Sequence, residues 1–273
     1  MTNILRGITR LCALGFVILL SAADYCVNVR SRHGRETARP HAAWLQRWTR
    51  KFLRVLNIRV TSTGMPPRRG MLVSNHLSYL DIAVLGSMAP MIFVSKKEVR
   101  DWPVFGWLSR CAGTLFVDRN RRPDVKRVTG EMSQLLNSGI VVALFPEGTS
   151  SNGNDVLRFR SPLLEPAVSL GWPVTSAFLS YRVADGSTEN DVCYWGDMDF
   201  LPHLMKLLSK KEVFATITFG LPKEADFDRK ELAFRLREEV IRLKNTADSV
   251  KEAAINETEA GNVTGEAMED LAR

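Results

Sequence analysis

The 273-residue sequence predicts an α/β fold in which a mixed, largely parallel sheet is flanked by helices, with a membrane-associated helical segment at the N-terminus. From residue 58 onward, short runs rich in β-branched and apolar residues alternate with helical patterns, which is typical of strand–helix–strand units. Residues 71–73 and 141–145 are nearly continuous apolar runs, as expected of central strands that helices cover on both faces. An apolar run at residues 11–23 is the third observation.

The individual elements follow from apolar periodicity and from the Gly- and Pro-containing turns between them. The predicted strands are residues 58–63, 71–75, 91–95, 114–118, 140–145, 174–182 and 213–220. The predicted helices are residues 79–88, 104–110, 123–137, 163–170, 201–208 and 228–245. We therefore expect membrane-anchoring or interfacial helices over residues 1–56, one α/β domain over residues 57–246, and an acidic, disordered tail over residues 247–273.

Charge is distributed unevenly along the chain, although the total is +7. Residues 1–70 contain 13 Lys and Arg against 2 Asp and Glu, whereas the remainder contains 24 against 28. The basic character therefore belongs to the N-terminal quarter, which argues against a uniformly basic nucleic-acid-binding domain. The four cysteines form no CxxC pair, so we interpret them as reduced thiols in the cytosol. The sequence also lacks the HExxH, P-loop, GxGxxG and GxSxG signatures.

The N-terminal apolar run has three interpretations. Its 13 uninterrupted residues fall short of the ~20 that a spanning helix needs. It is therefore a marginal transmembrane or interfacial helix, a cleaved signal peptide, or a helix of the soluble core. The arginines that follow, Arg30, Arg32, Arg35 and Arg39, are typical of a cytoplasmic segment beside a membrane and favour the first interpretation.

A second amphipathic pattern covers residues 41–56. Trp44, Trp48 and Phe52 recur at helical spacing, with Arg and Lys largely filling the gaps. Such a helix suits an anionic membrane surface, where tryptophan lies at the depth of the headgroups. A helix packed on the domain with solvated charges fits the pattern equally well. His33, His41 and His203 are interpreted as structural or surface residues.

The first motif whose residue types suit catalysis, residues 75–81, lies where a predicted strand ends and a predicted helix begins. Ligands bind at this edge of open α/β sheets, and a histidine there can take a proton at neutral pH. His76 and Asp81 meet only if His76 lies on the loop and Asp81 lies in the first helical turn. Ser78 as the N-cap residue supplies that geometry. In the structural alternative, a capping box, Asp81 merely satisfies backbone N–H groups.

Two further strand ends carry charged residues. Glu147 lies in a turn after a buried strand, where its carboxylate can accept hydrogen bonds from a polyol; the alternative is an ordinary strand-to-loop turn. Arg119 follows another strand, and its guanidinium group suits phosphate. Lys96 and Lys97 add positive charge after a third strand.

Four motifs occur in one order within residues 55–220. They are Asn75-His76 with Asp81, Gly113 to Arg119, Phe145 to Thr149, and Trp172-Pro173-Val174. In this order they resemble the glycerolipid acyltransferase family, typified by 1-acylglycerol-3-phosphate acyltransferase, with its NHxxxxD, GxxFxxR and FPEGT boxes and a segment around VP. Each box alone is modestly specific, whereas four in order are highly specific. The resemblance implies that residues 57–246 are an acyltransferase domain.

The resemblance also implies a reaction and a set of site residues. His76, oriented by Asp81, deprotonates the hydroxyl of a lysolipid, which attacks the thioester of acyl-CoA or acyl-carrier protein without a covalent enzyme intermediate, metal or cofactor. Arg119 holds the acceptor's phosphate, and Glu147 and Gly148 position its glycerol part. The other substrate-binding residues that the motifs imply are Asn75, Gly113 and Thr149. The implied location is the cytoplasmic face of the inner membrane.

One position departs from the family's pattern. Many members that act on phosphate lipids have Arg directly after FPEGT, whereas this sequence has Ser150, and Arg158 or Arg160 is a candidate to compensate. We therefore expect 1-acyl-sn-glycerol-3-phosphate as the acceptor, giving phosphatidic acid, with a lyso-ornithine lipid as the alternative. A different class, a catalytically inactive lipid-binding homologue at the membrane, is opposed by the intact His76 and Asp81.

Overall fold

The computed structural model describes residues 2–30, 38–225 and 228–270. Its centre is a seven-stranded sheet in the order β1-β7-β6-β2-β5-β3-β4. The strands are β1 (Ile58–Thr63), β2 (Met71–Ser74), β3 (Met91–Lys96), β4 (Leu115–Val117), β5 (Val141–Leu144), β6 (Val174–Val183) and β7 (Val213–Phe219). Every pair is parallel except β6 with β7. The predicted α/β fold with a largely parallel sheet is therefore confirmed, and each predicted strand is present.

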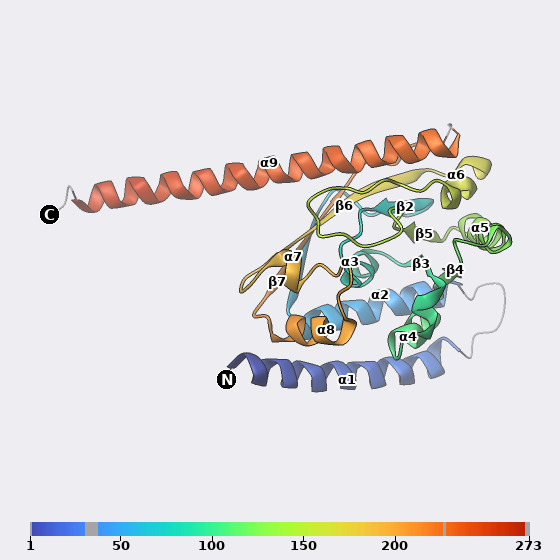
Figure 1. Cartoon of the computed structure of the whole chain (residues 1–273), viewed down its shortest axis with the longest axis horizontal. Coiled ribbons are helices and arrows are strands. Elements are labelled where there is room, and N and C mark those ends of the chain that lie inside the picture. The colour runs from blue at the N-terminus through green and yellow to red at the C-terminus, as the bar shows by residue number, and fades with distance from the viewer. Residues whose placement is uncertain (1, 31–37, 226–227, 271–273) are drawn as a thin grey trace.

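Helices cover both faces of the sheet (Figure 1). They are α1 (Thr2–Asn28), α2 (Ala38–Val55), α3 (Leu80–Met88), α4 (Phe105–Cys111), α5 (Arg122–Asn137), α6 (Glu165–Leu170), α7 (Thr188–Asp191), α8 (Phe200–Ser209) and α9 (Arg229–Asp270), with short 3-10 helices η1 (Lys97–Asp101) and η2 (Pro162–Leu164). Side chains of α2, α3, α4 and α8 fill one hydrophobic core, and those of α5, α6 and α9 fill the other. The elements η1 and α7 lie outside the predicted ones.

The central strands contribute side chains to both cores. Successive residues of a strand point to opposite faces of the sheet. Leu72 therefore packs on the side of α2 and α3, whereas Met71 and Val73 pack on the side of α5 and α9. Burying each such side chain contributes about 1.5–3 kcal/mol to folding. This burial on both faces explains why residues 71–73 are apolar without alternation.

The first two helices pack against each other through buried tryptophans. Trp44 Nε1 donates a hydrogen bond to the Ser21 carbonyl (3.1 Å), and Trp48 Nε1 donates to Asp24 Oδ2 (2.6 Å). Both indole side chains are buried, so the packed-helix interpretation of residues 41–56 holds for them. Of the four arginines expected beside a membrane, Arg32 and Arg35 lie outside the described residues.

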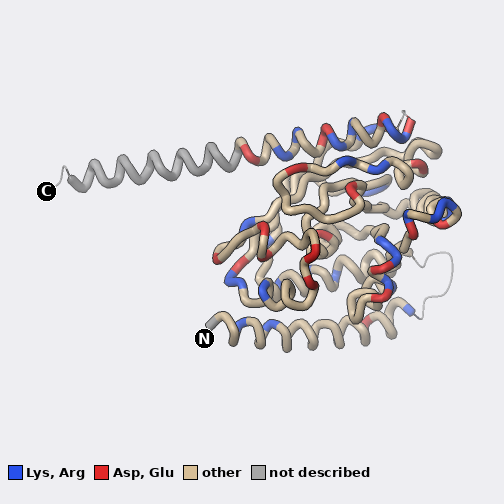
Figure 2. Tube along the Cα trace, in the orientation of Figure 1, with Lys and Arg blue, Asp and Glu red and all other residues tan. Residues whose placement is uncertain are grey.

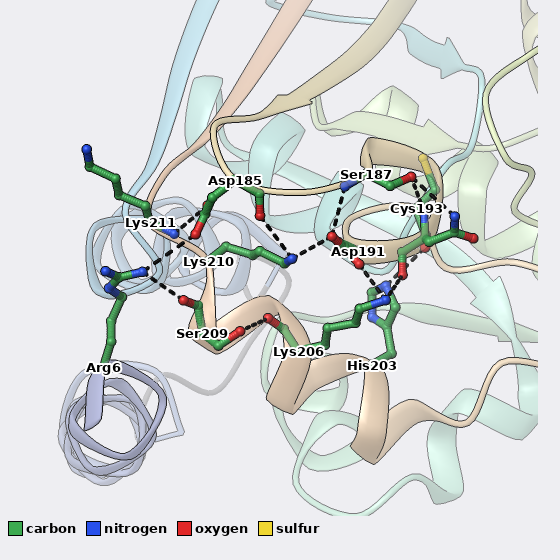
Figure 3. Close-up of polar contacts among 11 residues, drawn as sticks. Arg6, Asp185, Ser187, Asp191, Cys193, His203, Lys206, Ser209, Lys210 and Lys211 are labelled. Atoms are coloured by element: carbon green, nitrogen blue, oxygen red, sulfur yellow. Dashed lines mark hydrogen bonds and ion pairs between the residues drawn. The ribbon is translucent and has the colours of Figure 1, made fainter. Parts of the chain in front are cut away.

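The outer side of α1 is apolar and exposed, which does not fit a helix of the soluble core. Its exposed large side chains are Ile4, Leu5, Ile8, Leu11, Phe16, Leu19, Leu20 and Val27. Figure 2 shows no charged residue along the middle of this helix. The helix is long and apolar enough to cross a membrane by length and composition, and here it lies along α2 and α8. Arg6 Nη1 donates to the Ser209 carbonyl (2.9 Å) at the end of α8 (Figure 3).

The C-terminal helix differs from the prediction. We expected a helix over residues 228–245, whereas α9 continues to Asp270 and projects beyond the domain (Figure 1). The expected disorder of residues 247–273 stays a prediction. Leu232, Leu236 and Val240 in its first part pack on the core. The tail is rich in Ala and Glu, and the high helix propensity of these residues accounts for the helical backbone.

Candidate active site

Loops at the carboxyl ends of β2, β3, β4 and β5 surround a cavity of about 250 Å³, here called the catalytic cavity. Parallel strands end together at this edge, which is why ligands bind there. The predicted site residues that line it are His76, Arg119, Gly148 and Thr149. Other lining residues include Lys96, Trp102, Ser150, Tyr194 and Trp195. The predicted residues Asp81, Asn75, Gly113 and Glu147 do not line the cavity.

His76 and Asp81 form a hydrogen-bonded pair. His76 Nδ1 lies 2.7 Å from Asp81 Oδ2, and the imidazole stacks on the Phe145 ring with the ring centroids 4.1 Å apart. His76 lies on the loop after β2 and Asp81 lies in the first turn of α3, which is the placement that the spacing requires. With Nδ1 held by the carboxylate, Nε2 is the ring nitrogen that remains for a substrate in the cavity.

The carboxylate of Asp81 is completely buried and has four hydrogen-bond donors. Besides His76, the backbone N–H groups of Leu77 (2.6 Å) and Ser78 (3.0 Å) donate to Oδ2, and the Tyr181 hydroxyl donates to Oδ1 (2.7 Å). Burial and the nearby carboxylate raise the pKa of Tyr181, so its hydroxyl stays a donor. Because donors surround the carboxylate, Nδ1 of His76 carries the proton, and Nε2 is free to act as a base.

The predicted N-cap role of Ser78 is wrong. Tyr79 precedes the first helical residue and makes no side-chain cap, and Ser78 Oγ is buried with no partner among the described residues. Asp81 caps the loop from inside the helix, because its side chain accepts hydrogen bonds from the two backbone N–H groups named above. The structural interpretation of Asp81 therefore applies, and the same carboxylate holds His76 Nδ1 in the geometry that the catalytic interpretation requires.

Asn75 has a structural partner in place of a substrate. Its Nδ2 donates to the Leu179 carbonyl (2.9 Å), and its Oδ1 accepts from the Leu179 N–H (2.8 Å), which ties the end of β2 to β6. The next residues are held as well: the Ser151 N–H donates to the His76 carbonyl (2.9 Å), and the Tyr194 N–H donates to the Leu77 carbonyl (2.8 Å). These bonds give Asn75 a role in positioning the loop, and the prediction that it binds substrate stays untested.

Cations make up another part of the site. Lys96 and Arg119 line the catalytic cavity, and Arg160 lies beside Arg119. Burial lowers the pKa of Arg119, and the neighbouring charge of Arg160 lowers it further; burial and the charge of Arg119 lower the pKa of Lys96 in the same way. Lys97 pairs with Asp118 (2.6 Å), whereas the other three cations form no salt bridge among the described residues. This arrangement favours an anionic ligand.

Gly148 is the point at which two of these cations meet the FPEGT loop. Arg119 Nη1 donates to the Gly148 carbonyl (2.8 Å). Gly148 has φ +81°, and a Cβ at this position would lie 2.5 Å from Arg119 Nη1 and 3.2 Å from Arg160 Nε. Only glycine fits both the backbone conformation and the space. Arg160, one of the two arginines expected to compensate for Ser150, thus lies beside Arg119 and Gly148, whereas Arg158 lines neither of the two cavities that Arg119 lines.

Glu147 lies behind the catalytic cavity and does not face it. The residue is 3% exposed, and neither carboxylate oxygen has a hydrogen bond of normal geometry within the described part of the chain. The carboxyl group lies near the backbone of His76 and Leu157, and burial raises its pKa to about 8. The prediction that Glu147 positions the acceptor is not supported by this placement; its neighbours Gly148 and Thr149 face the cavity instead.

Comparison with known proteins identifies the family. Residues 57–180 match the model of the family described as Acyltransferase. The lyso-ornithine lipid O-acyltransferase of Pseudomonas aeruginosa is 36% identical over 234 residues, which cover 84% of this chain and 89% of that protein. This chain belongs to the acyltransferase family. It is an acyltransferase of the lysophospholipid type, as the motifs predict.

Other relatives of this acyltransferase have two kinds of acceptor in their names. The lyso-ornithine lipid O-acyltransferase of Brucella abortus is 36% identical over 65% of this chain and 72% of that protein. The 1-acyl-sn-glycerol-3-phosphate acyltransferase of Neisseria gonorrhoeae is 29% identical over 64% of this chain and 69% of that protein. The crystal structure of PlsC from Thermotoga maritima shares the fold, with a TM-score of 0.66 and 20% identity. The match covers 90% of this chain and 96% of that chain.

Gly113 of the acyltransferase lies away from the site. It follows α4 with φ +75°, and the Thr114 N–H donates back to the Ser109 carbonyl (3.0 Å), which is the pattern of a glycine that ends a helix. Because β4 runs from Leu115 to Val117 with its carboxyl end at the cavity, Gly113 lies at the opposite edge of the sheet. The predicted substrate contact at Gly113 is therefore not supported by this placement.

A second, apolar cavity of about 120 Å³ lies beside the catalytic cavity of the acyltransferase. It is enclosed by α2, α3, η1 and α4, and its aromatic lining comprises Trp44, Trp48, Phe52, Tyr79, Trp102 and Phe105. Tyr79, Ile82, Val99 and Trp102 line both cavities. Sequence reasoning missed this cavity, since its lining comes from several elements that no single motif connects.

Sequence reasoning also missed Tyr181. It lies about 100 residues after His76 and carries no local motif, so only the pairing of β6 with β2 brings it to the site. Within the described residues, no three His, Cys, Asp or Glu side chains gather as a metal site requires. That the reaction needs no metal or cofactor stays a prediction.

Proposed function

We propose that this protein transfers a fatty acyl group from a thioester to the hydroxyl group of a lyso-ornithine lipid, with His76 as the general base. The observation that carries the proposal is the position of His76. Its Nδ1 is held by Asp81, its Nε2 is left for a ligand, and the same cavity contains the cations Lys96 and Arg119. A base and an anion-binding group in one cavity suit a hydroxyl acceptor with a charged headgroup.

The reaction proceeds by direct transfer. His76 Nε2 removes the proton of the acceptor hydroxyl as its oxygen attacks the carbonyl carbon of the thioester. The C–O bond forms, the carbonyl becomes a tetrahedral oxyanion, and the C–S bond then breaks. The proton passes from His76 to the departing thiolate, so the base is regenerated. Asp81 stabilises the imidazolium between the two proton transfers.

The cations and Ser150 guide the choice of acceptor. An ornithine headgroup carries a carboxylate and an ammonium group. Lys96, Arg119 and Arg160 suit the carboxylate. Glu98, whose charge acts on both Lys96 and Arg119, suits the ammonium. Ser150 replaces an additional cation in the loop, which fits an acceptor with less negative charge than a phosphate. The relatives named for lyso-ornithine lipid also share more identity, 36% against 29%.

The second candidate acceptor is 1-acyl-sn-glycerol-3-phosphate. The observation in its favour is a cluster of three cations, Lys96, Arg119 and Arg160, that form no salt bridge with a carboxylate among the described residues. Such a cluster also suits a phosphate, with Arg160 in place of the arginine that Ser150 replaces.

The acyl chain and the membrane define the rest of the proposal. The apolar cavity beside the catalytic cavity takes the acyl chain of the thioester donor, acyl-CoA or acyl-carrier protein. The exposed apolar side of α1 associates with the cytoplasmic face of the inner membrane, where the lipid acceptor and product reside.

An acceptor screen tests the proposal. Purified protein in detergent is incubated with radiolabelled acyl-CoA, and separately with acyl-carrier protein, over lyso-ornithine lipid and 1-acyl-sn-glycerol-3-phosphate. His76→Ala is the matched control, with circular dichroism to establish that it folds. We expect ornithine lipid from the wild type and a loss of about 10³-fold in the variant. Phosphatidic acid as the main product supports the second candidate, and equal activity of His76→Ala contradicts the assigned base.

A further inference from the structure

The catalytic cavity and the apolar cavity share one wall, and Tyr79 is the residue of that wall whose side chain a hydrogen bond fixes. Its ring packs edge-on or tilted against four aromatic neighbours. These are Phe105, Tyr194, Phe200 and His203, with ring centroids between 5.1 and 6.4 Å away. The neighbours come from α4, α8 and the loop before α8, so the ring joins α3 to three other parts of the fold.

His203 holds the hydroxyl of Tyr79. Tyr79 Oη lies 3.0 Å from His203 Nδ1, and His203 Nε2 lies 3.0 Å from the Cys193 carbonyl (Figure 3 shows His203 beside Cys193). A carbonyl only accepts hydrogen bonds, so Nε2 carries the ring proton and Nδ1 accepts from the Tyr79 hydroxyl. Burial lowers the pKa of His203 and raises the pKa of Tyr79, which keeps the imidazole neutral and the hydroxyl protonated.

This pair is not used in the proton transfers at His76. His203 is buried on α8, and its two ring nitrogens are both occupied. Tyr79 lies between His76 on the loop and Asp81 in the first turn of α3, so the position of its ring is fixed relative to the base. The hydrogen bond therefore fixes where one cavity ends and the other begins.

We propose that Tyr79 is a specificity-determining residue for the transferred acyl chain, and that His203 is a positioning residue that acts through it. This inference rests on the proposed function. The thioester carbonyl must lie beside His76 while the chain enters the apolar cavity past the ring of Tyr79. The ring sets the path and depth of the chain, and the bond to His203 keeps the ring from turning into either cavity.

The experiment compares two thioester donors that differ only in acyl-chain length. The quantity measured is the ratio of kcat/KM for the long chain to that for the short chain. Partial unfolding lowers the active fraction equally for both donors, so a purely structural role does not change this ratio. The variants are Tyr79→Ala, which removes the shared wall, Tyr79→Phe, which removes only the hydroxyl, and His203→Leu, which removes the acceptor.

The conservative variant His203→Gln tests for rescue, because an amide both donates and accepts a hydrogen bond. His41→Gln is the matched control: His41 also bonds a backbone carbonyl, that of Cys111, but lines neither cavity. In Tyr79→Ala we expect the ratio of kcat/KM for the long chain to that for the short chain to change by about tenfold or more, toward equal use of the two donors. Tyr79→Phe and His203→Leu shift it by roughly threefold to tenfold, the effect of one hydrogen bond.

His203→Gln is expected to return the ratio close to the wild-type value, and His41→Gln to leave it unchanged. The inference is overturned if Tyr79→Ala keeps the wild-type ratio, or if Tyr79→Phe and His203→Leu both keep it. Neither outcome contradicts the proposed acyl transfer. Absence of transfer by the wild type with every donor and acceptor is a different result, since it overturns the proposed function.

Discussion

The two sides of the catalytic cavity are built in opposite ways. On the side of the base, Asp81 is buried and accepts four hydrogen bonds, and the backbone of the His76 loop is held by Ser151 and Tyr194. On the side of the cations, Arg119 Nε is buried without a partner among the described residues, and neither Lys96 nor Arg160 is paired there.

This difference means that the side of the base has a fixed geometry without substrate, whereas the side of the cations lacks a partner that a ligand supplies. A buried polar network with all its partners has one low-energy geometry, so the base is oriented before substrate arrives. Holding like charges close together and partly out of water is costly, as the lowered pKa values of Arg119 and Lys96 indicate. We therefore expect an anionic headgroup to relieve that cost and to complete the side of the cations.

The substitution Asp81→Asn removes the carboxylate that holds His76 Nδ1, and it has the largest expected effect among these tests. Asparagine places an N–H group where an acceptor is needed, so the Nδ1–H tautomer of His76 is no longer favoured and the imidazolium loses its counterion. We expect kcat to fall by about 10²–10⁴-fold, with a smaller change in KM for the acceptor. Steady-state kinetics with both substrates varied measures the two effects separately.

The control for this substitution is Tyr181→Phe, which removes one of the four donors and leaves the carboxylate and its other bonds in place. Its kcat is expected to fall by roughly tenfold or less. If Asp81→Asn turns over as fast as Tyr181→Phe, the carboxylate serves the loop more than the base.

The substitution Arg119→Ala weakens the cation side. It removes a guanidinium group that lines the cavity, together with its bond to Gly148. We expect KM for the acceptor to rise by about tenfold or more, the effect of one charge-assisted hydrogen bond, with kcat less affected. Arg121→Ala is the matched control, since Arg121 is exposed in the same loop and lines no part of the cavity. Equal KM values for the two variants contradict a headgroup contact by Arg119.

The same division explains how much of the site the sequence predicted. His76 and Asp81 are five residues apart on one strand–helix junction, so their meeting is a local event that spacing predicts. Arg119 was also found because it follows a strand of a parallel sheet, whose ends share one edge. Tyr181 and His203 reach the site through tertiary packing from distant elements, and no local pattern predicts such contacts.

The burial of Glu147 shows a second limit of prediction from sequence, which concerns the direction of a side chain. The strand-to-turn pattern predicted the turn correctly but not the direction of the side chain within it. Gly148, with its positive φ, turns the backbone so that Gly148 and Thr149 face the cavity while Glu147 lies behind it. The direction depends on a backbone conformation that the residue types alone left open.

Glu147 lies behind the cavity, so its titration tests the structure more directly than it tests the reaction. Its pKa of about 8 exceeds the ordinary 4.5, so the folded protein keeps this proton while the unfolded chain loses it. Stability is therefore unaffected by this group below about pH 4.5, falls as the pH rises from there to about 8, and is constant above that. Glu147→Gln cannot ionise and lacks this decline.

We therefore expect Glu147→Gln to melt close to the wild type at pH 5 and several degrees above it at pH 8, since each pKa unit corresponds to about 1.4 kcal/mol. Thermal unfolding of both proteins, followed by circular dichroism across this range, measures the difference. Parallel melting curves at all pH values mean that the carboxylate is solvated or paired in the folded state. In that case Glu147 faces the cavity, and the role in positioning the acceptor that its motif implies is restored.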